Sequence, residues 1–246
     1  MTHHKVAFCF LVYDSIIRYD IWNTFFKNID EDKYTVFIHP KNISSKMERA
    51  DFKYNIVKNR INTKSKDHIS IVEATLILLE EASAYDENIS HFIFLSQSCI
   101  PIYNFNILYD IITKFPYSVI SYIDNNKKER YNQLSNTVKR YFDISKFIKQ
   151  QPNMILTKED VIILLNNNLT AHFNNMQCPD EHYFINVLLN IFKRHVIRKQ
   201  INFCNNDMHK TQALEFNYVD TIFINNIRKH GFLFMRKVTD KSIINF

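Results

Sequence analysis

The chain has 246 residues, 46% of them hydrophobic, and a net charge of +6 at pH 7. This length and hydrophobic content suit one substantial domain with its own core and argue against intrinsic disorder. The only glycine, Gly231, leaves no place for a G-x-G-x-x-G dinucleotide motif or a P-loop. No apolar run approaches the roughly 20 residues of a membrane-spanning helix. With no visible signal peptide or anchor, we expect a soluble and cytoplasmic chain.

The spacing of the cysteines and of the basic residues argues against several further kinds of protein. No pair of cysteines has the C-x-x-C spacing of a zinc site, and no disulfide framework is indicated. The basic residues form only short clusters, such as Lys127-Lys128 and Arg198-Lys199, which are typical of solvated faces and also suit an anionic ligand. Nucleic-acid binding is disfavoured because no platform of interleaved aromatic and basic residues is present.

Strand-like and helix-like segments alternate along the chain. Strands are predicted at 5–13, 34–39, 91–96, 118–123, 154–156, 196–203 and 232–236. Helices are predicted between them. The capping boxes Ser70-x-x-Glu73 and Thr157-x-x-Asp160 mark the starts of two helices, and Pro179 marks the start of a third. The last helix is indicated by apolar residues at helical spacing, Val219, Ile222, Phe223 and Ile227, and Gly231 is placed to end it. This alternation predicts an α/β fold with a mainly parallel sheet.

The most informative segment runs from His91 to Phe105 (HFIFLSQSCIPIYNF). A buried strand ends in the polar turn Ser96-Gln97-Ser98, and a helical pattern follows. In open α/β sheets, ligands bind at the carboxyl ends of the strands, so we expect these three residues to line the floor of a binding site.

The same segment resembles the central block of the core-2/I-branching N-acetylglucosaminyltransferase-like proteins, glycosyltransferase family 14 and its plant relatives. Further blocks follow the family order over nearly the whole chain: Lys5–Val12, Val36–Lys41, Ser70–Ala74, Met154–Asp160, Pro179–His182 and Phe232–Lys237. The resemblance implies a GT-A-like nucleotide-sugar fold and a single glycosyltransferase domain over 1–246. Within it, about 1–123 would bind the donor, and about 124–246 would bind the acceptor and carry catalysis. Family relatives are typically anchored in the Golgi membrane.

Pro179-Asp180-Glu181-His182 is the main catalytic candidate. Acidic residues at a helix start are common, because free backbone N–H groups there favour negative charge, so the block alone is weak evidence. In the resembling family its glutamate is the catalytic base, which carries over to Glu181. A sugar hydroxyl that attacks an anomeric carbon must lose its proton, and a carboxylate can accept it. Asp180 is then expected to orient the site and contact the acceptor.

The leaving diphosphate needs positive charge nearby. The only Asp-x-Asp triplet, Asp30-Glu31-Asp32, lies in a predicted polar turn, so no metal site and no cofactor are expected. The resemblance instead implies that Lys237 and its neighbour Arg236 bind the phosphates; a strand flanked by surface charges is the simpler alternative. A second arginine of the family has no match, and His209 and Lys210 are the nearest basic residues.

The remaining assignments also come from the resemblance. It places His39 at a strand end near the nucleotide, and Glu129, Arg130 and Tyr131 in the acceptor region. Tryptophans that the family often carries before the blocks at 70 and 154 are absent, so acceptor identity does not transfer.

Together these features predict a metal-independent, inverting glycosyltransferase that moves a sugar, GlcNAc first, from a UDP-sugar to a carbohydrate or other hydroxyl acceptor. A catalytically inactive sugar- or nucleotide-binding descendant of the fold is the alternative.

Overall fold

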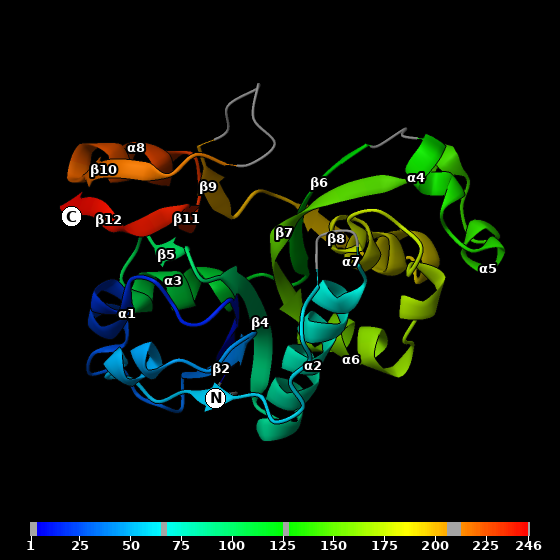
Figure 1. Cartoon of the computed structure of the whole chain (residues 1–246). Helices are drawn as coiled ribbons and strands as arrows, with labels where there is room; N and C mark the ends of the chain where they lie inside the picture. The colour runs from blue at the N-terminus through cyan, green and yellow to red at the C-terminus, as the bar shows by residue number, and fades with distance from the viewer. Residues whose placement is uncertain (1–3, 65–67, 125–127, 206–212, 246) are drawn as a thin grey trace.

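The centre of the protein is a seven-stranded sheet, seen in a computed structural model that describes residues 4–64, 68–124, 128–205 and 213–245 (Figure 1). Its strands lie in the order β3-β2-β1-β4-β7-β6-β8. They are β1 (Lys5–Val12), β2 (Tyr34–Pro40), β3 (Asn55–Ile56), β4 (Ile89–Ser96), β6 (Ser118–Asp124), β7 (Ile148–Thr157) and β8 (Val196–Arg198). β7 runs antiparallel to both neighbours, and all other pairs are parallel. The predicted α/β class with a mainly parallel sheet is therefore confirmed.

Helices cover both faces of this sheet, because its central strands are apolar on both sides. Along β1, Ala7 and Cys9 face one core, beneath α2 and α6, while Phe8 and Phe10 face the other, beneath α1 and α3. The α-helices are α1 (Tyr19–Phe26), α2 (Ser70–Tyr85), α3 (Phe105–Ile112), α4 (Lys128–Asn132), α5 (Asn136–Lys139), α6 (Lys158–Asn166), α7 (Tyr183–Ile185) and α8 (Thr221–Lys229). Short 3₁₀ helices are η1 (Ser45–Arg49), η2 (Ile144–Lys146), η3 (Thr170–His172) and η4 (Pro179–Glu181), and η5 (Asn186–Ile191) is a π-helix.

Two small sheets bring the last part of the chain back to the end of β4. β11 (Phe234–Arg236) lies between β5 (Ile100–Pro101) and β9 (Asn202–Cys204), and β10 (Phe216–Asp220) pairs with β12 (Val238–Asn245). The Val238 backbone N–H donates a hydrogen bond to the Ser98 carbonyl, 3.0 Å away. Arg236 and Lys237 therefore lie beside the turn that follows β4, although they are far from it in sequence.

Both predicted capping boxes are wrong, although each helix begins where it was expected. The Ser70 hydroxyl accepts a hydrogen bond from the Lys64 backbone N–H at 2.8 Å, and Thr157 makes no side-chain cap. The Asp160 carboxylate is buried and binds the Ser118 hydroxyl and Arg194, at 2.5 Å each. These side chains form hydrogen bonds with other elements of the fold instead of with the first turn of their own helix. The local spacing of residues does not predict such partners.

Several other helix and strand boundaries differ from those predicted from the sequence. Pro179 begins a 3₁₀ helix rather than one continuous α-helix. The last helix starts after the cap of Asp220, whose carboxylate accepts from the Phe223 N–H at 2.8 Å, so Val219 belongs to a strand. Gly231, at φ +77°, follows this helix as predicted. The predicted strand 196–203 is divided between β8 and β9, and the predicted strand 154–156 is the apolar end of the longer β7.

Candidate active site

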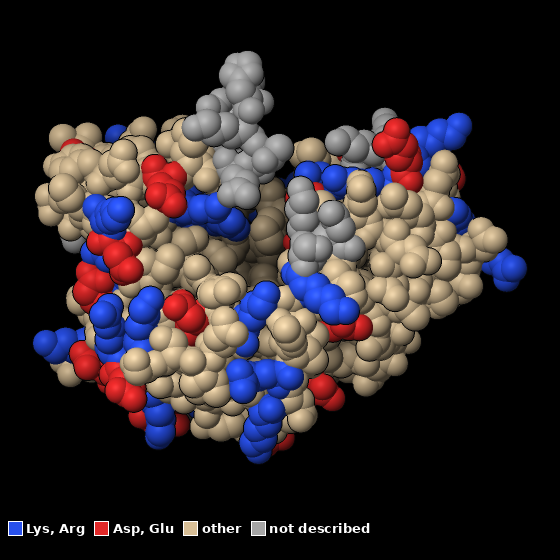
Figure 2. All heavy atoms as spheres, viewed as in Figure 1, with Lys and Arg blue, Asp and Glu red and all other residues tan. Residues whose placement is uncertain are grey.

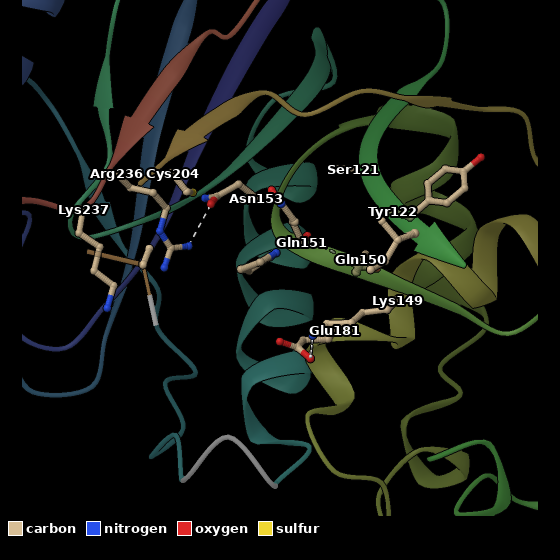
Figure 3. Close-up of a pocket in the computed structure, with 13 residues that line it drawn as sticks. Ser121, Tyr122, Lys149, Gln150, Gln151, Asn153, Glu181, Cys204, Arg236 and Lys237 are labelled. Carbon is tan, nitrogen blue, oxygen red and sulfur yellow. Dashed lines mark hydrogen bonds and ion pairs between the residues drawn. The ribbon is translucent and has the colours of Figure 1, made fainter. Parts of the chain in front are cut away.

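A pocket of about 380 Å³ opens at the edge where the parallel strands end. Its wall consists of residues 149–153 of β7, residues 121–123 at the end of β6, Glu181, Cys204, Ala213, Arg236 and Lys237 (Figure 3). In the space-filling view the molecule is hollowed between its two halves, with Lys and Arg atoms on the rim of the hollow (Figure 2). Three residues predicted from the sequence, Glu181, Arg236 and Lys237, therefore line one pocket.

The direction of β7 explains why its residues form the floor. Met154 pairs with Phe94 near the carboxyl end of β4, and the two strands are antiparallel, so the residues before Met154 extend beyond that end. Side chains alternate along a strand. Gln150 accordingly directs its side-chain oxygen inward, where it accepts from the buried Ile185 N–H at 2.7 Å, although the residue also borders the pocket. Lys149, Gln151 and Asn153 remain on the pocket side (Figure 3).

One end of the pocket is cationic. Arg236 donates from Nη1 to the Asn153 side-chain oxygen at 3.1 Å, and the Asn153 amide donates to the Phe94 carbonyl at 3.2 Å. Asn153 is buried, so it fixes the guanidinium against the end of β4. Among the described residues, nothing accepts a hydrogen bond from Arg236 Nε, which is buried. Because an unsatisfied buried donor costs free energy, an anionic oxygen in the pocket would be stabilised here.

The other end carries the candidate base. Oε2 of Glu181 accepts from Arg130 Nη1 at 3.1 Å and from Lys149 Nζ at 3.0 Å. The same Arg130 nitrogen lies 3.2 Å from Nε2 of His182, whose Nδ1 lies 2.9 Å from the Ile148 carbonyl. Burial lowers the pKa of His182 to about 4, with the nearby Arg130 charge acting in the same direction. The ring is therefore neutral, donates from Nδ1 and accepts from Arg130.

Asp180 has a different environment from its neighbour. Burial, reinforced by the charge of Glu181, raises its pKa to about 6. Its Oδ1 is buried, and within the described part of the chain no group donates to it. Asp180 does not line the pocket, so its predicted contact with an acceptor has no support in this geometry.

The predicted donor residues of the earlier strands lie outside this pocket. His39 is fully buried, its Nε2 accepts from the Ile61 N–H at 3.2 Å, and burial lowers its pKa. Ser96 ends β4, and Gln97 and Ser98 form the turn after it, but none of the three lines the pocket. The Gln97 side chain accepts from the Tyr13 N–H at 2.6 Å, and the Ser96 hydroxyl lies 3.2 Å from the Cys99 thiol.

Of the predicted acceptor residues, Arg130 alone reaches the site, through Glu181. The Tyr131 hydroxyl donates to the Phe142 carbonyl at 2.8 Å, and its ring packs edge-on against Phe147. Glu129 is exposed on α4 and lines no described pocket. His209 and Lys210, the nearest basic residues to the family's second arginine position, lie outside the described residues.

Lys149, Gln151, Asn153 and Cys204 line the pocket but were missed from the sequence. The sequence shows polar residues at 149, 150, 151 and 153 directly before the apolar Met154-Ile155-Leu156, but this run does not indicate which of these side chains face the pocket. Cys204 stands beside Arg236 in the register of β9 and β11, and burial raises its thiol pKa to about 11.

Asp30 and Asp32 lie at the opposite edge of the sheet from the pocket, because they precede β2 while the pocket is where the parallel strands end. Asp32 donates its backbone N–H to the Asp30 carboxylate at 3.0 Å, as in an ordinary turn. Within the described ranges, no group of three or more His, Cys, Asp or Glu side chains is placed to hold a metal ion.

Comparison with known proteins identifies the family. The family model "Branch: Core-2/I-Branching enzyme" matches residues 6–228. The chain belongs to the core-2/I-branching enzyme family. Membership confirms the resemblance carried by the sequence blocks.

The individual proteins to which the chain is similar share a third or less of their aligned residues with it. Glycosyltransferase BC10 of Oryza sativa subsp. japonica is 30% identical over 131 residues, which cover 52% of this chain and 33% of the relative. The match therefore spans about a third of that protein. The bifunctional glycosyltransferase WbbM, in its apo structure, is 12% identical with a TM-score of 0.48 over 94% of this chain and 45% of its own. The galactosyltransferase LgtC, in complex with donor and acceptor sugar analogues, is 10% identical with a TM-score of 0.41 over 80% of this chain and 75% of its own.

Across the described residues, no helix is both long enough and apolar enough to cross a lipid bilayer.

Proposed function

We propose that this chain is an inverting glycosyltransferase that uses a UDP-sugar, with UDP-N-acetylglucosamine the first choice, and needs no divalent metal. The observation that carries the proposal is the pocket itself. It holds a carboxylate, Glu181, on one side and two cations, Arg236 and Lys237, on the other (Figure 3). A transfer reaction requires this separation, because a base must act on the acceptor while positive charge stabilises the departing diphosphate.

The proposed reaction is a single displacement. Glu181 removes the proton from an acceptor hydroxyl while the hydroxyl oxygen forms a bond to the anomeric carbon of the donor sugar. The bond from that carbon to the diphosphate oxygen breaks in the same step. The electron pair leaves with UDP, whose added charge is met by Arg236 and Lys237. Attack from the face opposite the leaving group inverts the anomeric configuration. Lys149 pairs with Glu181, the one acid among the lining residues, and Arg236 and Lys237 add positive charge that suits a diphosphate.

A catalytically inactive binding protein is the second candidate, and one observation favours it. Glu181 is paired with two cations, Arg130 and Lys149, as in a purely structural ion-pair cluster. Such a protein would bind UDP through Arg236 and Lys237 without turning the donor over.

A UDP-release assay separates these functions. The protein is incubated with UDP-N-acetylglucosamine, UDP-xylose and other UDP-sugars, with sugar acceptors, in the presence and absence of EDTA. UDP release that persists in EDTA supports the proposal. UDP binding without release from any donor favours the binding protein. Release that EDTA abolishes and Mn²⁺ restores would overturn metal independence.

A further inference from the structure

The two ion pairs of Glu181 meet at a single atom. Both Arg130 Nη1 and Lys149 Nζ contact Oε2, at 3.1 Å and 3.0 Å. In the described structure no hydrogen bond to Oε1 is found, and Figure 3 shows the second carboxylate oxygen turned away from Lys149, towards the side of the pocket that holds Arg236 and Lys237. The carboxylate thus has one oxygen held by protein and one directed into the pocket.

The groups that hold Oε2 are themselves fixed. Lys149 projects from β7, a central strand of the sheet. Arg130 comes from the short helix α4, but neutral His182 accepts from the same nitrogen at 3.2 Å. The His182 ring is fully buried, is bonded to the Ile148 carbonyl and stacks on Phe147 with a centroid separation of 4.6 Å. A charged group anchored in this way loses little additional freedom when it pairs with Glu181.

We propose that Arg130 and Lys149 are positioning residues that clamp Oε2 of Glu181, so that Oε1 is the atom that takes the acceptor proton. This rests on the proposed function of Glu181 as the base. The clamp reconciles the double ion pair with catalysis, because the two cations fix the orientation of the carboxylate and leave its other oxygen directed into the pocket. A base displaced by about 1 Å from the reacting hydroxyl can lose about 10²-fold in rate.

The physical existence of the clamp is tested without any activity measurement. Arg130→Met and Lys149→Met are each combined with Glu181→Gln, and unfolding by urea is followed for the single and double variants. If the pairs are real, each cation couples to Glu181, and the unfolding constant of the double variant departs from additivity by about three- to tenfold. Additive effects for both cations would overturn the proposal.

The positioning role is tested by transfer kinetics. Arg130→Met and Lys149→Met should lower kcat about tenfold or more while the UDP dissociation constant stays within about twofold. Arg130→Lys should restore part of kcat, since it returns a cation to the same carboxylate oxygen. Lys146→Met is the matched control, because Lys146 is an exposed lysine of the neighbouring η2 that forms no ion pair with a described residue. Its kcat should match the parent.

The outcomes separate this inference from the function on which it rests. Unchanged kcat in both Met variants, with Glu181→Gln inactive, overturns the clamp and leaves Glu181 as the base. Stability coupling in a parent that transfers no sugar supports the clamp and contradicts the proposed function. A fall in kcat accompanied by an equal loss of UDP affinity shows that the cations serve the donor instead, and overturns the positioning role.

Discussion

Replacing Asp180 by Asn should make the protein more stable at pH 7 and more sensitive to mild acid. Asp180 and His182 flank the candidate base, and folding shifts their pKa values in opposite directions. Burial raises the pKa of Asp180 from 3.8 to about 6, so its contribution to stability is fully present below pH 4 and is lost as pH rises through about 6. Burial lowers the pKa of His182 from 6.5 to about 4, so its contribution is present above pH 6.5 and is lost as pH falls through about 4.

The two effects are similar in size and oppose each other over the same pH range. At about 1.4 kcal/mol for each pH unit, each amounts to about 3 kcal/mol. Near pH 5 the folded state has gained about one proton at Asp180 and lost about one at His182, relative to the unfolded state. These two groups together should therefore give the parent almost no slope of stability with pH between 4 and 6.

The Asp180→Asn variant leaves the effect of His182 uncompensated, and the difference between variant and parent isolates the effect of Asp180. Asp180→Asn should be more stable than the parent by up to about 3 kcal/mol at pH 7, because no charge is buried at that position, and the gain should vanish by pH 4. The measurement is the free energy of urea unfolding at pH 4, 5, 6 and 7, and the quantity to compare is the variant minus the parent, since other groups cancel. His182→Gln is the control and should tilt the difference the opposite way. A variant-minus-parent difference that stays constant from pH 4 to 7 would refute the reasoning.

The remaining predictions concern the pocket. Glu181→Gln should lower transfer about 10²–10⁴-fold with UDP affinity kept, because only basicity is lost; turnover within a few-fold of the parent would exclude Glu181 as the base. The double variant Arg236→Ala/Lys237→Ala should bind UDP more weakly than the parent and bind uridine equally well, by calorimetry, since each charged hydrogen bond contributes about 1.5–3 kcal/mol; equal UDP affinity in a folded variant would leave both as surface charge. Asn153→Ala should weaken UDP binding about tenfold by releasing the Arg236 guanidinium; no loss in titrations with UDP would show that Arg236 needs no such support.

Much of the fold followed from local apolar patterns. The runs that become β1, β2 and β4 are apolar on both faces, so their positions were visible without any knowledge of their partners. The polar first half of β7 was missed, because its residues border a pocket and therefore lack the apolar run that marks the second half of the strand. Among the described strands, β10 and β12 pair with each other alone, and their residues carry no comparable apolar run.

The site was predictable where motif and topology agreed. Glu181, Arg236 and Lys237 belong to family blocks, and all three meet in one pocket. His39 also ends a strand, but the Ile61 N–H from a distant segment caps its ring and buries it. Tyr131 is likewise committed to core packing by Phe142 and Phe147. Whether a polar side chain remains accessible to a ligand depends on which distant segments pack against that side chain. The spacing of residues along the sequence does not predict those contacts.

The reversed direction of β7 has a consequence for how such a site can diversify. Its apolar end, Met154 to Leu156, lies between β4 and β6, whereas its beginning, Lys149 to Asn153, extends past β4, pairs with β6 and borders the pocket. Substitutions at position 151 alter what the pocket touches without removing a core side chain or the Lys149–Glu181 ion pair, so the chemistry of the pocket wall can change along this strand while the scaffold remains folded.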